Sequence, residues 1–302
     1  MTVKREYESV KGDDVVLGEV GLDSEYLERH VPTFAKAASA ILAIDPLLLP
    51  VFTKADFDLF KHREPGYVEP SDDAKLQNAF SKLGGAIVGQ QISNAAARSI
   101  RIKFQALFGE RFPLFTELQE YAKDADNLKS MRECGLSQRK VSYMLSLADY
   151  FAENSDRLKQ LYYHGGENCD NEICEDLVAG VKGIGPWTAK MFLVSGLRRF
   201  DIFAPEDVGV ARGFARYIGE RPELLAELQQ EIKDEGPARK RKKSPVKHKT
   251  TTWKIYDIDL MEKCADRFAP YKTVFMFLLW RLSGTGKVDV TIDVENQFVN
   301  TL

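Results

Sequence analysis

The chain has 302 residues, 44% of them hydrophobic, which is enough apolar material for one large core or two modest cores. Its formal net charge of -3 excludes a broad positive field, so any binding of nucleic acid must depend on local placement of hydrogen-bond donors. The first residues lack the apolar segment of a signal peptide, and no apolar run approaches the roughly 20 residues of a membrane span. We therefore expect a soluble intracellular protein with no membrane partner.

Helical periodicity dominates the sequence, and strand alternation is almost absent. Residues 1–22 carry no helical pattern and are predicted to form a flexible N-terminus. From Asp23 to Ile41, apolar residues recur at spacings of three and four, which predicts one helix that ends at Asp45-Pro46. A second apolar stripe from Leu76 to Ile87 predicts the next helix.

A short polar turn, Gly89-Gln90-Gln91-Ile92, follows this stripe and points polar side chains outward. Ser93 is then predicted to cap a helix that Gly109 closes, because a serine hydroxyl accepts a hydrogen bond from a helix amide and glycine readily adopts the left-handed conformation at a helix end. Gly135 and Ser137 separate the next two predicted helices, the second of which carries apolar residues from Val141 to Phe151.

The segment from Val181 to Ala189 is the most informative part of the chain. Asn171 is predicted to cap the helix before it, and the turn Gly183-Ile184-Gly185 follows. Pro186 then takes the first position of another helix, where its missing N–H does no harm. The segment is thus a helix, a hairpin turn and a helix. Further helices are predicted from about Val208 to Ile218, from near Asp257, and from Val274 to Leu282.

The charge is unevenly spread. Between Arg239 and Lys249 there are seven basic and no acidic residues, so 42 less 7 leaves 35 basic against 45 acidic residues elsewhere. We predict a mobile basic insertion over about 236–252, which could be a solvated loop, a nuclear address or a tether to phosphates. The four cysteines have no zinc-type spacing and are expected to be reduced thiols: Cys134, Cys169, Cys174 and Cys264.

The hairpin turn has the properties of a phosphate-binding site. Glycine at 183 and 185 permits positive φ and removes the Cβ atoms that would keep a phosphate oxygen away from backbone amides. Those amides lie at the start of the helix that Pro186 begins, where the helix dipole also favours an anion. Such a turn by itself often only caps a helix. Its helical neighbours and the following Pro-Trp-Thr-Ala make the phosphate-binding interpretation more specific.

Five motifs, in this order and spacing, resemble those of the helix-hairpin-helix DNA glycosylases, and within that superfamily the yeast-type 3-methyladenine DNA glycosylases. The resemblance spans roughly residues 24 to 283. The motifs are Ile87-Val88-Gly89-Gln90-Gln91-Ile92-Ser93 with Ala95-Ala96, Gly135-Leu136-Ser137-Gln138-Arg139-Lys140, Lys182 to Leu193, Asp201-Ile202-Phe203-Ala204-Pro205-Glu206-Asp207, and Pro270-Tyr271 to Trp280-Arg281-Leu282.

The resemblance assigns Asp207 as the catalytic residue. Cleavage of an N-glycosidic bond builds positive charge on the sugar, which an adjacent carboxylate stabilises while it orients or deprotonates water. A helix start keeps such a carboxylate charged. The alternative role for Asp207 is the N-cap of the helix from Val208, which aspartate fills routinely. Glu206 is adjacent, but Asp207 matches the family motif.

The resemblance also bears on the kind of glycosylase. Relatives that cut the strand use a lysine two residues after the second hairpin glycine, and Trp187 stands there. We therefore expect a monofunctional enzyme that uses water and has no lyase activity. The four-cysteine iron–sulfur signature of some relatives is absent, so no cofactor is expected to be required.

Further site residues follow from the same resemblance. Gln91, with Gln90 beside it, matches the wedge that enters the duplex when a base is swung out, although a polar turn residue or helix cap remains an alternative. Trp187 and Trp280 match positions that line the base pocket, and Met191 stands where a bacterial relative has tyrosine. Aromatic faces favour a cationic alkylated base, whereas tryptophan at helical spacing is often a core residue.

The hairpin is expected to hold one DNA phosphate and, in related proteins, its carbonyls bind a cation. The phosphate-binding residues are Gly183, Ile184, Gly185 and Thr188. The carbonyls that could bind a structural monovalent cation are those of Ala179, Val181 and Ile184.

Together these features predict an all-α fold with two helical lobes, a helix-hairpin-helix motif and a catalytic cleft between the lobes. A discontinuous lobe is expected over 23–78 plus 200–302, and the lobe with the hairpin over 79–199. The predicted function is hydrolysis of alkylated purines, such as 3-methyladenine and 7-methylguanine, from double-stranded DNA by a nuclear monomer that initiates base excision repair. The alternatives are an inactive lesion sensor, or a glycosylase for another base such as uracil or a mismatched pyrimidine.

Overall fold

The computed structural model describes residues 21–166, 169–235 and 252–284. Within these ranges the elements are helices, and the β-type pairing is an isolated antiparallel bridge between His30 and Lys61. This confirms the all-α prediction for the described part of the chain. No helix in these ranges is long and apolar enough to cross a membrane. Nearly all of the predicted flexible N-terminus and the basic insertion lies outside the described residues.

The N-terminal helices pack against one another. They are α1 (Ser24–Glu28), α2 (Pro32–Ile44), the 3-10 turn η1 (Pro46–Leu48), α3 (Leu49–Phe52) and the 3-10 turn η2 (Asp58–Phe60). The predicted single helix from Asp23 to Ile41 is wrong, because it is broken before Pro32, which has no N–H and cannot continue a helix. The amide of Val31 donates instead to the carbonyl of Phe60 at 2.8 Å.

The middle of the chain contains α4 and α8, the two longest of the described helices, together with shorter elements. In chain order the elements are α4 (Asp72–Gly89), α5 (Asn94–Ala106), α6 (Phe115–Tyr121), α7 (Ala125–Glu133), α8 (Gln138–Lys159) and the π-helical turn η3 (Gln160–His164). Ser93 caps α5 as predicted, with its Oγ accepting from the amide of Ala96 at 3.3 Å, and Ser137 caps α8 in the same way. Gly109 has a φ of +70° in the turn that follows α5.

The remaining helices carry the predicted site. They are α9 (Asp170–Gly180), α10 (Pro186–Ser195), α11 (Val208–Gly219), α12 (Pro222–Asp234), α13 (Ile258–Asp266) and α14 (Lys272–Leu282). The prediction that Asn171 caps α9 is wrong, because the helix begins at Asp170 and Cys169 occupies the N-cap. Pro186 is the first residue of α10, as predicted. Helix α12 was not predicted, although Pro222 at its start is a typical initiation signal.

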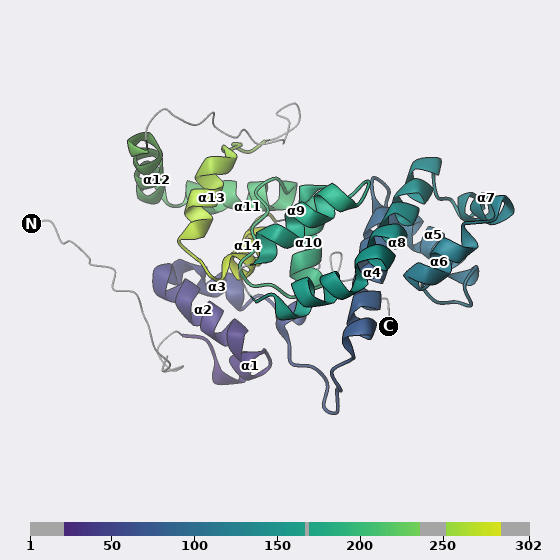
Figure 1. Ribbon diagram of the computed structural model, residues 1–302. Helices are drawn as coiled ribbons and strands as arrows, with labels where there is room; N and C mark the ends of the chain where they lie inside the picture. The colour runs from purple at the N-terminus through teal and green to yellow at the C-terminus, as the bar shows by residue number, and fades with distance from the viewer. Residues whose placement is uncertain (1–20, 167–168, 236–251, 285–302) are drawn as a thin grey trace, which may run out of the picture.

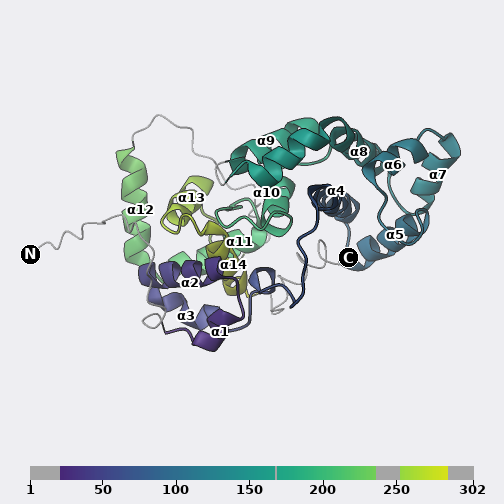
Figure 2. The same cartoon turned by 60° about the horizontal axis from the view of Figure 1, so that its bottom comes forward.

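The helices form an elongated molecule with one connected hydrophobic core (Figures 1 and 2). Helices α5, α6 and α7 lie at one end in both views, and α1 to α3 lie with α12 and α13 toward the other. The strongest packing joins α4 with α8 on one side and α11 with α14 on the other. The lobe boundaries at 23–78 plus 200–302 and 79–199 stay a prediction.

Helix α10 lies in the middle of the molecule, next to α9 in both views (Figures 1 and 2). Four consecutive side chains of this helix, from Met191 to Val194, have no exposed surface. Burial on every face fixes the helix firmly, since any shift would open a cavity or force an overlap in a close-packed core. The hairpin that precedes α10 and the residues of its first turn are therefore held in one orientation.

Candidate functional site

Asp207 lies at the start of α11 and is half-buried. Its Oδ1 accepts a hydrogen bond from the amide of Val210 at 2.9 Å, so it does act as the N-cap of this helix. This contact engages one of the two carboxylate oxygens. The capping role and a catalytic role are therefore compatible in the same side chain.

Two indole groups also donate to this carboxylate. Nε1 of Trp280 donates to Oδ1 of Asp207 at 2.9 Å, and Nε1 of Trp187 donates to Oδ2 at 3.1 Å. Hydrogen bonds to a charged acceptor are stronger than those to a neutral one, so three donors stabilise the negative charge. No Lys, Arg or His among the described residues forms an ion pair with Asp207. Within the described part of the chain, the carboxylate is thus stabilised by neutral donors and has no countercharge.

Two glycines bring Trp280 to Asp207. A Cβ added at Gly213 would stand 1.8 Å from the carbonyl oxygen of Leu279, and one at Gly209 would stand 2.8 Å from Cδ1 of Trp280. These glycines are four residues apart and so share one face of α11. Helices α11 and α14 approach each other closely because this face has no side chains. This pair was not singled out in the sequence, although its spacing is visible there.

The segment before Asp207 is tied to α14 by Thr273. The Oγ1 of Thr273 donates to the carbonyl of Arg199 at 2.8 Å and accepts from the amide of Ile202 at 2.9 Å. The amide of Asp207 itself donates to the carbonyl of Ala204 at 3.1 Å. Since Thr273 and Trp280 belong to the same helix, α14 holds both the incoming chain and the carboxylate that it carries.

Glu206, next to Asp207, has a different environment. Its carboxylate forms an ion pair with Lys190 of α10 at 3.1 Å. A carboxylate that is paired with an ammonium offers little net negative charge to a third group. Glu206 is therefore the weaker candidate for stabilising a cation, which agrees with the motif-based choice of Asp207.

The hairpin lies across one face of α8. The amide of Lys182 donates to Oγ of Ser146 at 3.1 Å. A Cβ at Gly180 would stand 2.3 Å from the ring of Tyr150, and one at Gly183 would stand 2.2 Å from the ring of Tyr143. Residues 143, 146 and 150 are three and four apart, so they share a helix face. Two glycines of the hairpin are thus required by the two tyrosine rings beneath them.

Gly183 and Gly185 differ in backbone conformation and in the space beside them. Gly183 has a φ of +83°, the left-handed region that glycine favours. Gly185 has a φ of -103°, and a Cβ added there would meet nothing within 4 Å. The prediction that both glycines serve positive φ is therefore wrong for Gly185. Because no protein atom requires glycine at 185, the open space beside it suits an external group such as a phosphate.

The turn Gly89-Gln90-Gln91-Ile92 contains the predicted wedge Gln91, and we call it the wedge turn. The hairpin and the wedge turn face the same groove, which has a volume of about 730 Å³. The groove lies between the ends of α4, α8 and α10. Among the predicted site residues, Gln90, Gln91, Gly183, Trp187 and Thr188 line it, together with Arg139, Lys140 and Tyr143. Trp187 connects this groove with Asp207, since it lines the groove and donates to the carboxylate.

The two glutamines of the wedge turn have different surroundings. Nε2 of Gln90 donates to the carbonyl of Gly183 at 2.8 Å, so this side chain connects the turn with the hairpin. Gln91 is exposed, has a φ of +60°, and makes no hydrogen bond to another described residue. The structure therefore leaves Gln91 available as the wedge and engages Gln90 within the protein. Entry of either side chain into DNA stays a prediction.

The residues predicted to line the base pocket differ in exposure. Trp187 is 38% exposed, Trp280 is 4% exposed and Met191 has no exposed surface. Thr188, a predicted phosphate-binding residue, is 6% exposed, although its amide lies in the first turn of α10, where helix amides have no intrahelical partner. Trp187 is thus the member of this group that an incoming base can reach directly.

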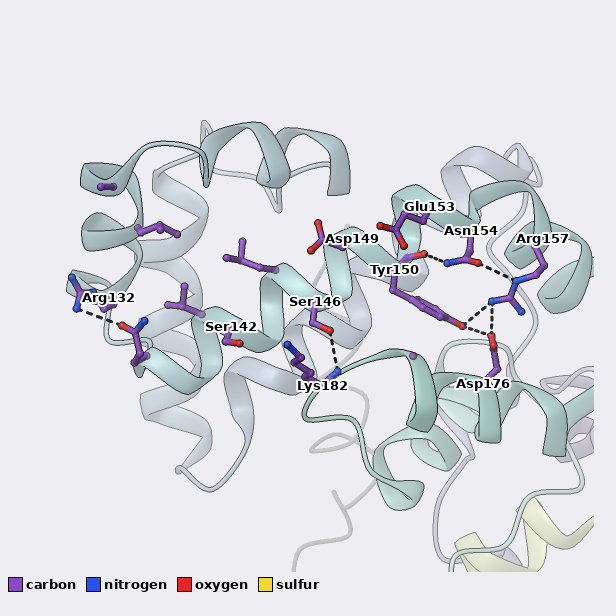
Figure 3. A pocket seen from close by; sticks show the side chains of 16 residues that line it. Arg132, Ser142, Ser146, Asp149, Tyr150, Glu153, Asn154, Arg157, Asp176 and Lys182 are labelled. Carbon is purple, nitrogen blue, oxygen red and sulfur yellow. Dashed lines mark hydrogen bonds and ion pairs between the residues drawn. The ribbon is translucent and has the colours of Figure 1, made fainter.

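A second hollow lies on another face of α8, with a volume of about 830 Å³ (Figure 3). None of Asp207, Trp187 and Trp280 lines it. Figure 3 shows Tyr150, Arg157 and Asp176 joined by hydrogen bonds at one end and Lys182 beside Ser146 in the middle. These contacts fasten α9 and the hairpin to α8, so we assign the hollow a structural rather than a chemical role.

No cluster of His, Cys, Asp or Glu that could hold a metal ion occurs among the described residues. The four cysteines are unpaired thiols. In the hairpin, the carbonyl of Val181 accepts from the amide of Ile184 at 3.3 Å, a contact within the turn itself. Binding of a monovalent cation by the carbonyls of Ala179, Val181 and Ile184 stays a prediction.

The fold and this site define a class of protein. A helix-hairpin-helix turn, with open space beside Gly185, stands near a carboxylate that has no ion pair with a described residue, and the described elements are helical. That combination is typical of helix-hairpin-helix proteins that act on DNA, because it offers one phosphate a main-chain site and the adjoining sugar a negative charge.

Comparisons with known proteins agree with this class. The family described as the HhH-GPD superfamily of base excision DNA repair proteins matches residues 85–236. The chain is 43% identical to the DNA-3-methyladenine glycosylase of Saccharomyces cerevisiae, over the full length of both proteins. It is 26% identical to DNA-3-methyladenine glycosylase 1 of Schizosaccharomyces pombe, covering 54% of this chain and 68% of that protein.

Solved structures give the same result. A DNA-3-methyladenine glycosidase from Bacillus halodurans aligns with a TM-score of 0.57 at 25% identity, covering 85% of this chain and 94% of the other. The 3-methyladenine DNA glycosylase of Schizosaccharomyces pombe in complex with abasic DNA aligns with a TM-score of 0.51 at 22% identity, covering 82% and 95%, which shows the shared fold. The chain therefore belongs to the HhH-GPD superfamily of base excision DNA repair proteins. The family predicted from the five motifs is confirmed.

Proposed function

We propose that this protein is a monofunctional DNA glycosylase that hydrolyses the N-glycosidic bond of 3-methyladenine and related alkylated purines in double-stranded DNA. The observation that carries the proposal is the carboxylate of Asp207, which accepts three hydrogen bonds, has no ion pair with a described residue, and is connected through Trp187 to the groove of the hairpin. The identity of 43% to a protein named DNA-3-methyladenine glycosylase supports the substrate class.

The proposed reaction uses Asp207 as an electrostatic group. As the bond between base and sugar breaks, positive charge develops on the deoxyribose, and a fixed carboxylate beside it stabilises that charge without reorganising. The same carboxylate orients the water that attacks the sugar and accepts its proton. The hairpin amides hold a phosphate of the lesion strand, so the sugar is presented in one position.

Substrate selection rests on charge and on the weakened bond. A purine alkylated at N3 or N7 is cationic and leaves readily. The exposed ring of Trp187 offers such a base a π face, an attraction of about 1–2 kcal/mol when water is excluded. Normal bases are neutral and are attracted less strongly to this π face. Small differences in binding of this size, added to the intrinsic reactivity of the alkylated base, are sufficient for moderate selectivity.

The environment of the amines supports hydrolysis without strand cleavage. Trp187 occupies the position where lyases of this superfamily have a lysine, and the nearby Lys190 is engaged by Glu206 at 3.1 Å. A lysine that is held as a protonated ion-pair partner is a poor nucleophile. The product is therefore expected to be an intact strand with an abasic site.

The test is release of 7-methylguanine from a methylated duplex under single-turnover conditions. Asp207→Asn is nearly isosteric and is expected to lower the rate by about 100-fold or more, since one fixed electrostatic group is lost. Glu206→Gln is the matched control, adjacent in sequence and paired with Lys190, and it is expected to retain a rate within about threefold of wild type. Equal rates for wild type and Asp207→Asn would refute the catalytic assignment.

The same experiment separates the alternatives. A lesion sensor would bind methylated duplex and release no base, so base release by the wild-type protein in this assay excludes that function. Competition between methylated and uracil-containing duplexes tests a glycosylase of different base preference. Cleavage of the strand at the abasic site, without alkali or heat, would contradict the absence of lyase activity.

A further inference from the structure

The wedge turn between α4 and α5 contains a strained residue. Gln91 has a φ of +60°, and a residue with a Cβ pays roughly 1–2 kcal/mol to occupy the left-handed region. Such a conformation persists only where its surroundings fix it. Gln91 is exposed and makes no hydrogen bond to another described residue, so its own side chain does not fix it. The support must come from the residues on either side.

Lys140 supports the turn from below. It is half-buried in the first turn of α8, and its Nζ donates to the carbonyl of Val88 at 2.6 Å. Val88 is in the last turn of α4, where helix carbonyls have no intrahelical partner. A lysine at this end of α4 satisfies the carbonyl and complements the negative end of the helix dipole.

The placement of Lys140 is unfavourable for its own helix. Cations are disfavoured in the first turn of a helix, and burial lowers the pKa of this ammonium group. A residue that breaks a local rule in this way commonly serves a function elsewhere. Here Lys140 stabilises the end of α4 through its hydrogen bond to Val88. The family resemblance alone gave no role to the motif from Gly135 to Lys140, and this contact supplies one.

Gln90 supports the turn from the other side. Its Nε2 donates to the carbonyl of Gly183, so the residue before Gln91 is attached to the hairpin at 2.8 Å. The hairpin rests in turn on Tyr143 of α8, one helical turn after Lys140. The wedge turn, the phosphate-binding turn and the first two turns of α8 are thus joined in a closed set of contacts.

We propose that Lys140 and Gln90 are positioning residues that hold Gln91 as a rigid wedge at a fixed place relative to the phosphate-binding hairpin. They act through Gln91 and touch neither the base nor the sugar. This inference rests on the proposed function, since a wedge is needed only where a base is taken out of the duplex. Loss of either contact makes extrusion of a paired base less favourable, while a base that is already unpaired needs little help.

The test compares two substrates with the same 7-methylguanine, one paired with cytosine and one opposite an abasic site. Lys140→Met is expected to lower single-turnover release from the paired substrate by about tenfold, as expected for a lost charged hydrogen bond, and from the unpaired substrate by less than about twofold. Lys140→Arg restores a donor to Val88 and is expected to recover most of the loss. Gln90→Ala is expected to show the same pattern more weakly.

A double variant separates positioning from general damage. If Lys140 acts through Gln91, then Lys140→Met combined with Gln91→Ala is no slower than Gln91→Ala alone. The matched control is Lys129→Met, which removes one exposed cation from α7 and should change neither substrate. Additive losses in the double variant, or equal losses on both substrates, would overturn the proposal.

A second measurement does not depend on base release. A 2-aminopurine placed beside the 7-methylguanine is expected to brighten on binding Asp207→Asn, because the wedge unstacks it, and to brighten much less when Lys140→Met is added. Equal brightening would contradict the inference. If the wild-type protein releases no base from either duplex, yet brightens the probe and does so much less when Lys140→Met is introduced, the proposed function fails and the positioning role of Lys140 stands.

Discussion

The groove of the hairpin and the surroundings of Asp207 are built in different ways. The groove is formed by main chain and by close steric fits, with Gly180 and Gly183 lying on two tyrosine rings. The carboxylate is held by side-chain hydrogen bonds from Trp187 and Trp280 around a single charge. Binding of a strand depends on shape and on backbone amides, whereas stabilisation of a cation depends on a charge held in a fixed direction.

Trp187 is where the two regions meet. It follows the hairpin in the first turn of α10, lines the groove, and donates to Oδ2 of Asp207. In the proposed mechanism, a base that enters the site meets the residue that contacts the carboxylate of Asp207. The remaining support is separate, since α8 supports the hairpin, whereas α14 supports the carboxylate at the start of α11 through Trp280. Substitutions in α8 and α14 should accordingly have distinct consequences.

The largest effect is expected on the side of Asp207, at Gly213. Gly213→Ala places a Cβ at 1.8 Å from the carbonyl of Leu279, which forces α11 and α14 apart and is expected to lower the free energy of unfolding by about 3 kcal/mol or more. Urea denaturation measures this loss. Gly219→Ala, on the same helix but with nothing within 4 Å, is the control and should be nearly neutral. Similar stabilities for the two variants would show that the helices do not approach so closely.

The hairpin glycines offer the sharpest contrast within the groove. Gly183→Ala meets Tyr143 and requires positive φ, so we expect it to lower the free energy of unfolding by roughly 2 kcal/mol. Gly185→Ala should leave stability within about 0.5 kcal/mol and weaken duplex binding by about tenfold, because its methyl group enters the phosphate position. Thermal unfolding and a duplex titration distinguish the two. A stable, tightly binding Gly185→Ala protein would place the phosphate elsewhere.

A smaller effect is expected from removing one donor to the carboxylate. Trp280→Phe keeps an aromatic ring and loses the hydrogen bond to Oδ1 of Asp207, which should slow single-turnover base release by about tenfold with little change in duplex affinity. Trp253→Phe is the control. Trp253 lies beside Arg212 and is not among the residues that donate a hydrogen bond to Asp207. A loss of affinity without a loss of rate would mean that Trp280 binds the base and does not orient the carboxylate.

The smallest effect is a dependence of folding stability on pH that arises from His30. Buried His30 donates from Nδ1 to the carbonyl of Tyr26 at 2.8 Å and accepts at Nε2 from the amide of Phe57 at 3.0 Å, so both nitrogens are engaged as a neutral ring. Burial lowers the pKa of His30 below its ordinary value of 6.5. As the pH falls below 6.5, His30 is protonated in the unfolded chain but still neutral in the folded protein. The free energy of unfolding that the neutral, buried His30 provides above pH 6.5 therefore decreases until the pH reaches the folded-state pKa.

For one such group, the free energy of unfolding is expected to fall by at most about 1.4 kcal/mol for each pH unit. Urea midpoints measured between neutral and mildly acidic pH test it. His30→Gln should remove this part of the dependence, and His62→Gln, at an exposed position, should leave it in place. A pH dependence that survives in His30→Gln would assign it to other groups.

Local features were predictable from the sequence and distant contacts were not. Pro186 and the caps at Ser93 and Ser137 lie beside the turns that they define, so short patterns sufficed. The donation from Lys140 to Val88 joins residues 52 apart, and that from Trp280 to Asp207 joins residues 73 apart. Nothing in a local pattern shows that such residues meet, because packing of whole helices decides it.

Two of the errors concern a proline and a glycine. Apolar periodicity continues through Pro32, so the pattern predicted one helix although the missing N–H of proline breaks it. Gly185 was given the same conformational role as Gly183, yet its φ of -103° is open to any residue and its lack of a side chain concerns the space outside the protein. Residue type alone did not distinguish a glycine required by packing, such as Gly183, from one whose Cβ would meet no protein atom within 4 Å, such as Gly185.

The central claim is that the carboxylate of Asp207 stabilises positive charge at the sugar, and the most direct measurement is affinity for two abasic mimics. One duplex carries a neutral tetrahydrofuran and the other a cationic pyrrolidine, which resembles the charged transition state. We expect wild-type protein to bind the pyrrolidine duplex at least about 100-fold more tightly, and Asp207→Asn to bind both duplexes equally while keeping its tetrahydrofuran affinity. An undiminished preference for the cation in Asp207→Asn would contradict the account.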